Sequence, residues 1–354
     1  MGIDRTVWWG VSCDDGGMRP VIRTLLRVGA LAGAGFAGEK ALARRVRTRQ
    51  RGDDHLLVPP ADVRHLTVPA HDGGSLHLLE RGEGRPLLLI HGITLNAELW
   101  SPQLHELASD FRVLSLDQRG HGRSVAGDDG YGMAQLGRDI ATVLTRLDLR
   151  DALVVGHSMG GMAALNFAVD HPDVLHERVS GLGLVATAAA RPVVPLLVPR
   201  ATALGALIVD RLDSGKPVRS MRFSGNDLSL FLIRTVFGKD PSSAAIEQVR
   251  ASIEGTDEDA IQRLLAGILH EHDTTERLGD VDVPAFVVVG SRDLLTPPMF
   301  ARLMVENLPD AELTVLPQAG HQLMQERPDD VARLIRDLAE RTEGAAGVLA
   351  PTGS

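Results

Sequence analysis

A serine between two glycines, at the centre of the segment Gly156 to Gly160, is the residue best suited to nucleophilic chemistry in this sequence. It follows a short apolar run, residues 152–155, that predicts a strand, and it precedes a segment that predicts a helix. A serine at the apex of a strand-to-helix turn has a strained backbone, and side chains two residues away on either side would clash there. The spacing therefore predicts that Ser158 is a nucleophile.

A serine hydroxyl attacks only when a base accepts its proton, and the base needs an acid that fixes its tautomer. Asp293 is the best acid, because it follows the apolar run 285–289 at the carboxyl end of a predicted strand, where α/β sheets place their catalytic groups. His321 is the best base, because its loop follows the last predicted strand and reaches the same sheet edge. Asp280 and Asp282 are weaker alternatives for the acid, since they precede that strand.

The other histidines near these segments are expected to be ordinary surface or core residues. They lie in the early hairpin, inside the serine turn, or in the insertion described below: His65, His71, His77, His157, His270 and His272.

The tetrahedral intermediate of acyl transfer needs two N–H donors, each of which lowers the barrier by about 3 kcal/mol. We expect one donor to be the N–H of Met159, directly after the nucleophile, and the other to be the N–H of Ile93. His91 and Gly92 precede Ile93 at the end of a predicted strand, and His91 is interpreted as a support that orients this loop through backbone hydrogen bonds.

The elements that must position these residues follow an alternating pattern after residue 62. Segments 62–68 and 76–80 predict a hairpin. Near-continuous apolar runs separated by helix-length segments are typical of a buried parallel sheet covered on both faces. The runs are residues 86–90, 112–116, 152–155, 179–185, 285–289 and 313–316, and the connecting helices are expected at 102–109, 133–148, 159–171, 297–307 and 328–340.

About ninety residues separate the strand ending near Val185 from the next strand, which predicts an inserted helical cap with helices at 201–212, 228–236, 243–253 and 260–269. The expected organisation is a basic N-terminal extension, an α/β core interrupted by the cap, and a flexible tail. Its boundaries are 1–52, 53–187, 188–277, 278–342 and 343–354.

The N-terminal extension differs in charge from the rest of the chain. Residues 1–52 hold ten Lys and Arg against four Asp and Glu, a net charge of +6. Since the whole chain has a net charge of −9, the remaining residues carry −15. The apolar run 28–38 is too short to span a bilayer, which needs about 20 residues. Three hypotheses compete for residues 18–51: a basic helix in peripheral contact with a membrane, a solvated or core-docked helix, and a cleaved export signal. Met18 is expected to be the true start.

Composition excludes several classes of function. The acidic body argues against nucleic-acid binding, because phosphate binding needs clustered Lys and Arg. Cys13 is the only cysteine, so there is no intramolecular disulfide and no thiolate metal cluster. No dinucleotide-binding glycine motif follows the first strand, and Walker, His-Glu-x-x-His and Cys-x-x-Cys motifs are lacking. We expect no cofactor, no metal, and a cytoplasmic location with membrane association through the extension, export remaining an alternative.

From residue 62 to about residue 340, the chain resembles the α/β-hydrolase superfamily. The resemblance rests on the His91-Gly92 loop, the segment Asp117 to Ser124, the Gly-His-Ser-Met-Gly-Gly turn, and the late Asp293 and His321. It implies an α/β-hydrolase fold with a mostly parallel, doubly wound sheet and a helical cap.

The resemblance also implies roles for single residues. Ser158, Asp293 and His321 would act as nucleophile, acid and base, with Ile93 and Met159 as oxyanion donors. Epoxide hydrolases and haloalkane dehalogenases of this superfamily carry aspartate where this chain has Ser158, which argues against those two chemistries.

The predicted function is hydrolysis of a carboxylic ester through an acyl-enzyme on Ser158, as in carboxylesterases and lipases. The substrate is expected to be a small apolar ester or acyl compound, because the apolar segments 192–199 and 201–209 would line an acyl pocket or pack the cap on the core. Alternatives within the enzyme class are cofactor-free perhydrolase or haloperoxidase-like chemistry, lactone or thioester hydrolysis, and hydrolysis of a carbon–carbon bond. A noncatalytic protein that binds a ligand or docks on a membrane is the alternative from another class.

Overall fold

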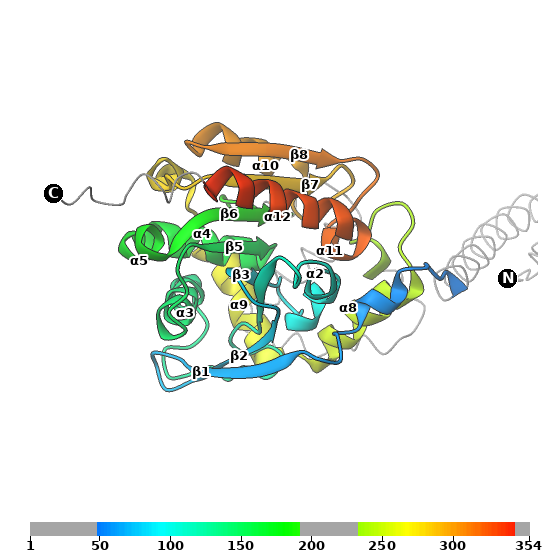
Figure 1. The fold of residues 1–354 in the computed structure, drawn as a ribbon, viewed down its shortest axis with the longest axis horizontal. Helices are drawn as coiled ribbons and strands as arrows, with labels where there is room; N and C mark the ends of the chain where they lie inside the picture. Colours follow the sequence, from blue (N-terminus) through cyan, green and yellow to red (C-terminus); the bar gives the residue numbers. More distant parts are fainter. Residues whose placement is uncertain (1–47, 192–232, 344–354) are drawn as a thin grey trace, which may run out of the picture.

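A single eight-stranded sheet forms the centre of the computed structural model, which describes residues 48–191 and 233–343 (Figure 1). The strands are β1 (Arg64–Pro69), β2 (Ser75–Arg81), β3 (Arg85–Ile90), β4 (Phe111–Leu116), β5 (Ala152–His157), β6 (Val179–Val185), β7 (Ala285–Gly290) and β8 (Ala311–Leu316). Their order is β1-β2-β4-β3-β5-β6-β7-β8. The pairs β1–β2 and β2–β4 are antiparallel and all others are parallel. This confirms the predicted mostly parallel α/β sheet.

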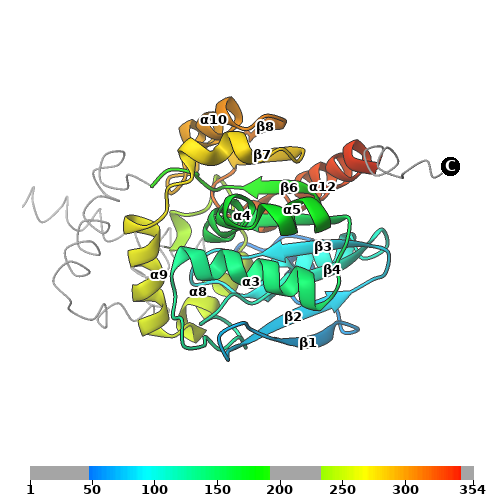
Figure 2. The same ribbon diagram turned by 90° about the vertical axis from the view of Figure 1, so that its left-hand side faces the viewer.

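Helices cover both faces of the sheet (Figure 2). They are α2 (Ser101–Glu106), α3 (Met133–Arg146), α4 (Met159–Asp170), α5 (Pro172–Arg178), α8 (Ser243–Gly255), α9 (Glu258–His270), α10 (Pro298–Asn307), α11 (Leu323–Glu326) and α12 (Pro328–Glu343), with 3-10 turns η1 (Asp54–Leu57), η2 (Ala97–Trp100) and η4 (Thr275–Asp280). One core contains buried residues of α3, α4 and α10, and the other contains residues of α2, α11 and α12.

The central strand β3 shows why the sequence gives continuous apolar runs. Leu88 and Ile90 belong to the core on one face, while Leu87 and Leu89 belong to the core on the other face, and all four are fully buried. Successive side chains of a strand point to opposite faces, so a strand covered on both sides must be apolar at every position.

The five helices expected in the core are present with small shifts at their ends, and the hairpin of β1 and β2 is confirmed. Helix α5, which begins at Pro172, was not expected. Its seven residues follow α4 after one residue, His171, at which the expected helix 159–171 ended.

The insertion between β6 and β7 contributes α8 and α9 to the described residues. Both match predicted helices. Helix α8 buries Ile246 and Val249 in the core beside α2 and α12, whereas α9 buries Leu264 and Ile268 in the core beside α3. The predicted helix 201–212, most of the predicted helix 228–236 and the apolar segments 192–209 lie outside the described residues, and the domain boundaries remain predictions.

Residues near the start of the described chain contact the insertion. The side chain of Arg49 forms an ion pair with Asp240 at 2.6 Å, and its carbonyl oxygen accepts the N–H of Ser243 at 2.7 Å. Most of the basic extension, residues 1–47, and almost all of the expected tail lie outside the described residues. Within the described ranges, no helix is long and apolar enough to cross a membrane.

Candidate active site

Ser158 lies at the sharp turn between β5 and α4, with backbone angles φ 52° and ψ −119°. A positive φ at a residue with a side chain costs about 1–3 kcal/mol and persists only where neighbouring structure enforces it. The N–H of Ser158 donates to the carbonyl of Val185 at 3.0 Å, and the hydroxyl of Thr187 donates to the carbonyl of Ser158 at 2.7 Å. Both partners belong to β6 or the loop after it, so the neighbouring strand holds the turn in its strained conformation.

The two glycines around the turn are required by close backbone approaches. A Cβ atom on Gly156 would lie 2.3 Å from the carbonyl oxygen of Gly160, and one on Gly160 would lie 2.4 Å from the carbonyl oxygen of Ile90. Real Cβ atoms do not come this close to backbone oxygens. The glycine spacing seen in the sequence therefore has a direct steric cause.

Asp293 and His321 form a buried hydrogen-bonded pair at the same sheet edge. The Nδ1–H of His321 donates to Oδ2 of Asp293 at 2.8 Å, and both residues are 3% exposed. Oδ1 of Asp293 accepts the N–H groups of Leu295 and Thr296 at 2.8 and 2.9 Å, and the Thr296 hydroxyl donates to Oδ2 at 2.9 Å. The carboxylate is thus fixed by four donors, with one oxygen facing the imidazole.

The loop of His321 lies against the turn that carries Ser158. The ring centroids of His157 and His321 are 4.8 Å apart, and Nε2–H of His157 donates to the carbonyl of His321 at 3.0 Å. The structure therefore brings the histidine–aspartate pair beside the residue that precedes Ser158, as three chain segments meet at the carboxyl ends of β5, β7 and β8.

The two expected oxyanion donors also lie at this edge. The N–H of Met159 is in the first turn of α4, where a helix leaves its N–H groups without intrahelical acceptors. Gly92 passes so close to the nucleophile that a Cβ there would lie 3.1 Å from Cβ of Ser158, which places the loop of Ile93 beside it. Thr94, at φ 62°, donates its N–H to Nε2 of His121 at 3.0 Å and so fixes the end of this loop.

His91 is fully buried, and its ring bonds to backbone groups of its own loop and the next. Its Nδ1–H donates to the carbonyl of Gly92 at 2.7 Å, and its Nε2 accepts the N–H of Gln118 at 3.0 Å. The side chain of Gln118 returns a hydrogen bond to the carbonyl of His91 at 2.6 Å. These contacts give His91 and Gln118 a supporting position beneath the loop.

The alternative acids lie away from this group. Asp280 ends η4 and Asp282 precedes β7, so both are at the opposite edge of the sheet from Asp293. Both are exposed, and Asp282 pairs with His176 at 2.8 Å. Among the other histidines, His77 bonds to Asp117 at 2.7 Å and His272 to the carbonyl of Ala188 at 2.8 Å.

Four buried histidines, His91, His121, His157 and His272, have lowered pKa values, and burial is the main cause for each. For His121, burial lowers the pKa to about 3. Its hydrogen bonds agree with a neutral ring, because Nε2 accepts from Thr94 while Nδ1–H donates to the carbonyl of Arg119 at 3.1 Å. These rings therefore support the loops only while they are uncharged.

This arrangement predicts a loss of stability in weak acid. The unfolded chain protonates these histidines near pH 6.5, whereas the folded chain does not, so stability is present above pH 6.5 and falls as pH drops. Each histidine contributes up to about 1.4 kcal/mol per pH unit. We expect the free energy of unfolding, measured with urea, to be lower at pH 5 than at pH 7.5, and the slope to be smaller in His121→Gln. The exposed His55→Gln is the control. Equal stability of the parent at both pH values would contradict the prediction.

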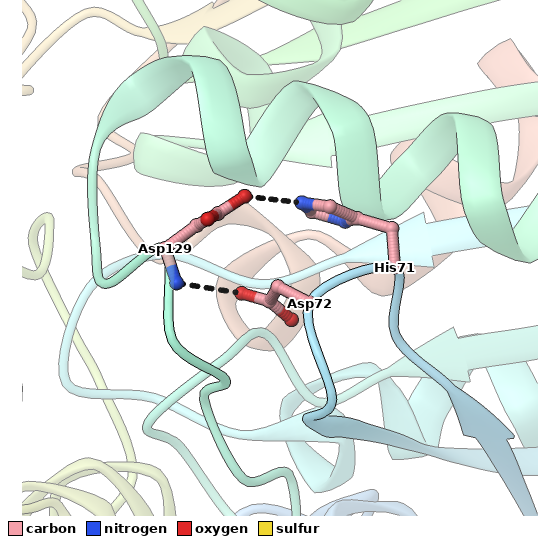
Figure 3. A group of neighbouring side chains, drawn as sticks. All are labelled: His71, Asp72 and Asp129. Carbon is pink, nitrogen blue, oxygen red and sulfur yellow. Dashed lines mark hydrogen bonds and ion pairs between the residues drawn. The ribbon is translucent and has the colours of Figure 1, made fainter.

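One group of side chains has the composition of a cation site. His71, Asp72 and Asp129 bring ligand atoms within 4.8 Å of one another (Figure 3). However, Oδ2 of Asp72 already accepts Nη1 of Arg119 at 2.9 Å, and this guanidinium also pairs with buried Asp139 at 2.7 Å. A guanidinium beside a ligand oxygen repels a second cation. We therefore interpret the cluster as an ion-pair network that joins the β1–β2 turn to the loop before α3.

Two residues of the site were not found from the sequence. Thr187 and Thr296 act through hydrogen bonds to Ser158 and Asp293. Only Thr296 had a local signal, because a threonine three residues after an aspartate can form a side-chain-to-backbone turn. Gln118 lies in the segment Asp117 to Ser124 that carries the resemblance, but its contact with His91 was not predicted. The contact between Thr187 and Ser158 depends on the pairing of β5 with β6, which no local pattern reveals.

Comparisons with known proteins identify the family of this chain. Residues 87–334 match the model of the alpha/beta hydrolase family. A non-heme haloperoxidase of Rhodococcus erythropolis is 30% identical over 75% of this chain and 95% of its own length. A pimeloyl-[acyl-carrier protein] methyl ester esterase of Chromobacterium violaceum is 30% identical over 75% of this chain and 97% of its own.

Among solved structures, a thermophilic esterase from Thermogutta terrifontis superposes with a TM-score of 0.63. It is 26% identical, and the match covers 79% of this chain and 99% of the esterase. The family match spans more than half of the chain and contains all three residues of the proposed triad. The chain therefore belongs to the alpha/beta hydrolase family.

Proposed function

We propose that this hydrolase cleaves carboxylic esters through an acyl-enzyme on Ser158. The observation that carries the proposal is the strained turn at Ser158 with the buried Asp293–His321 pair on the loop beside it. This is the combination of nucleophile, base and orienting acid that acyl transfer requires.

In the proposed mechanism, Oγ of Ser158 attacks the ester carbonyl carbon and its proton passes to Nε2 of His321. Asp293 holds Nδ1–H of His321 and stabilises the imidazolium that forms. The negative oxygen of the tetrahedral intermediate accepts hydrogen bonds from the N–H groups of Met159 and Ile93. His321 then gives its proton to the departing alkoxide, and a water molecule hydrolyses the acyl-enzyme by the same steps.

An apolar substrate is supported by the surface next to the acid. Leu294, Leu295 and Met299 follow Asp293 and are 46%, 40% and 55% exposed. Exposed large apolar side chains beside a catalytic residue favour contact with an apolar acyl or alcohol group. The apolar segments of the cap lie outside the described residues, so the acyl pocket stays a prediction.

A second candidate is perhydrolase or haloperoxidase-like chemistry, favoured by the similarity to the Rhodococcus haloperoxidase. It would use the same acyl-enzyme, with hydrogen peroxide in place of water as the attacking group. The products would be a peracid and free Ser158, and the peracid would then oxidise halide. Both candidates therefore depend on the same nucleophile.

Labelling with a fluorophosphonate tests the proposed nucleophile directly. We expect the probe to form one covalent adduct with the parent protein, located on Ser158 by peptide mass spectrometry, and none with Ser158→Ala. The reason is that the phosphonyl group reacts only with a serine activated by a base. A parent protein that stays unlabelled, or an adduct that persists in Ser158→Ala, would refute the assignment.

A further inference from the structure

A buried carboxylate outside the triad lies directly behind the loop of His321. Glu326 ends α11 and is 8% exposed. Among the described residues it forms no ion pair within 4.0 Å, and its two oxygens instead accept backbone N–H groups. Oε2 accepts from Gly238 at 2.7 Å and from Gly320 at 3.1 Å, while Oε1 accepts from Gly320 at 3.1 Å and from Gln322 at 3.2 Å.

Two of these three donors flank the proposed base. Gly320 and Gln322 are the residues on either side of His321, so one carboxylate holds the backbone before and after the imidazole. The third donor, Gly238, belongs to the insertion and lies shortly before α8. Glu326 therefore connects two chain segments that are about eighty residues apart in the sequence.

The same two segments are joined by direct backbone hydrogen bonds. The N–H of His321 donates to the carbonyl of Val236 at 2.8 Å, and the N–H of Lys239 donates to the carbonyl of Gln318 at 2.9 Å. The contact is so close that a Cβ on Gly320 would lie 2.4 Å from the backbone nitrogen of Gly238. The segment of the insertion before α8, residues 236–239, thus forms one wall of the loop that carries His321.

Keeping a carboxylate here has a cost. Burial raises the pKa of Glu326, because a charge loses its hydration inside the protein, and the N–H groups of Gly238, Gly320 and Gln322 act against this rise. An apolar side chain would fill the space without that cost but would leave these N–H groups without an acceptor. The contacts of Glu326 therefore fix the geometry of the loop. Both of its carboxylate oxygens accept backbone N–H groups.

We propose that Glu326 is a positioning residue that fixes the loop of His321 and fastens to it the segment of the insertion before α8, residues 236–239. The inference rests on the proposed function, in which His321 is the base. It assigns the segment 236–239 of the insertion a part in assembling the active site, because this segment and the loop of the base share one carboxylate.

The test replaces Glu326 with glutamine, which keeps the size of the side chain. Glutamine has one acceptor oxygen and one NH2 group, so in either orientation at least one backbone N–H faces a donor. We expect kcat for p-nitrophenyl butyrate to fall about 10- to 100-fold, because small displacements of a catalytic group have effects of this size. KM should stay within about twofold, since substrate contacts are unchanged.

A double-mutant comparison separates positioning from a general structural role. If Glu326 acts through His321, Glu326→Gln should have less than about a twofold effect on the residual activity of His321→Ala. An equal loss in both backgrounds would overturn the proposal. The matched control is Glu80→Gln, another buried carboxylate, which pairs with Arg112 and Arg64 on the antiparallel side of the sheet and should leave kcat unchanged.

Two further outcomes are informative. Should Glu326→Gln fail to fold, Glu326→Asp keeps the charge on a shorter side chain, and we expect an intermediate loss of kcat with KM retained. If an active parent enzyme loses nothing in Glu326→Gln, this inference is wrong and the proposed function stands. If the parent enzyme hydrolyses no ester and takes up no fluorophosphonate, the proposed function fails first.

Discussion

Replacing Ser158 with alanine should lower kcat for p-nitrophenyl butyrate by about 10⁶, the order of effect expected when a serine nucleophile is removed from a triad. The turn itself should survive, because the carbonyl of Val185 and the hydroxyl of Thr187 still bond to the backbone of residue 158, and Gly156 and Gly160 still leave room for it. Alanine keeps the Cβ that the turn already accommodates. The loss would therefore report the missing hydroxyl rather than a damaged fold.

Steady-state kinetics with the purified variant would measure this loss, and thermal unfolding would check the fold. Ser180→Ala is a suitable control, since Ser180 lies at the amino end of β6, where its hydroxyl contacts Arg85 and the carbonyl of Ala152. The control should keep full activity. If the parent enzyme also brominates phenol red with acetate, peroxide and bromide, Ser158→Ala should abolish that reaction too. Retention of either activity above about a hundredth of the parent value would place the nucleophile elsewhere.

The sheet was largely predictable because its strands are buried on both faces. Runs such as residues 86–90 and 179–185 carry few polar side chains, and this composition identifies buried parallel strands without any knowledge of their neighbours. The order of the strands was not predictable. It depends on which crossover places β3 between β4 and β5, and no residue inside a strand encodes that choice.

The site divides in the same way. Ser158, Asp293 and His321 could be proposed from the sequence because each follows a recognisable strand, and the carboxyl ends of parallel strands meet at one edge. Glu326 could not be found, since its role depends on contact with Gly238 and Gly320, which only the folded chain brings together. Sequence patterns reveal side chains that directly follow a strand. They do not reveal distant side chains that hold the loops after those strands in place.

The histidines illustrate a further limit. Only its place after the last strand distinguishes His321 in the sequence, and its carboxylate partner does not show there, nor do the backbone partners of His121 and His157. His77 also pairs with a buried carboxylate, Asp117, yet it lies on β2, away from the nucleophile turn. A histidine–aspartate pair alone therefore does not define a catalytic site. The position of the pair relative to Ser158 determines whether the histidine can act as the base.

Asp293→Asn should reduce kcat/KM by about 10³ to 10⁴, and the contacts of the carboxylate explain why the loss should be this large. Oδ1 of Asp293 accepts two backbone N–H groups, from Leu295 and Thr296. In the variant, the amide oxygen must stay on that side, because an NH2 group there would face two donors. The NH2 group then lies where Oδ2 was, 2.8 Å from Nδ1 of His321 in the parent structure.

An NH2 group at that position donates to Nδ1 and stabilises the tautomer of His321 with its proton on Nε2. Such a ring cannot accept the proton of Ser158, so the base is lost although every residue remains in place. Asp282→Asn is the matched control, since Asp282 is exposed at the far edge of the sheet, and it should retain parent activity. A loss below about tenfold in Asp293→Asn, measured with the same ester at pH 7.5, would mean that Asp293 does not orient the base. The two N–H groups at Oδ1 allow the amide only one orientation. That orientation places the proton of His321 on Nε2, and the position of this proton determines the loss of activity.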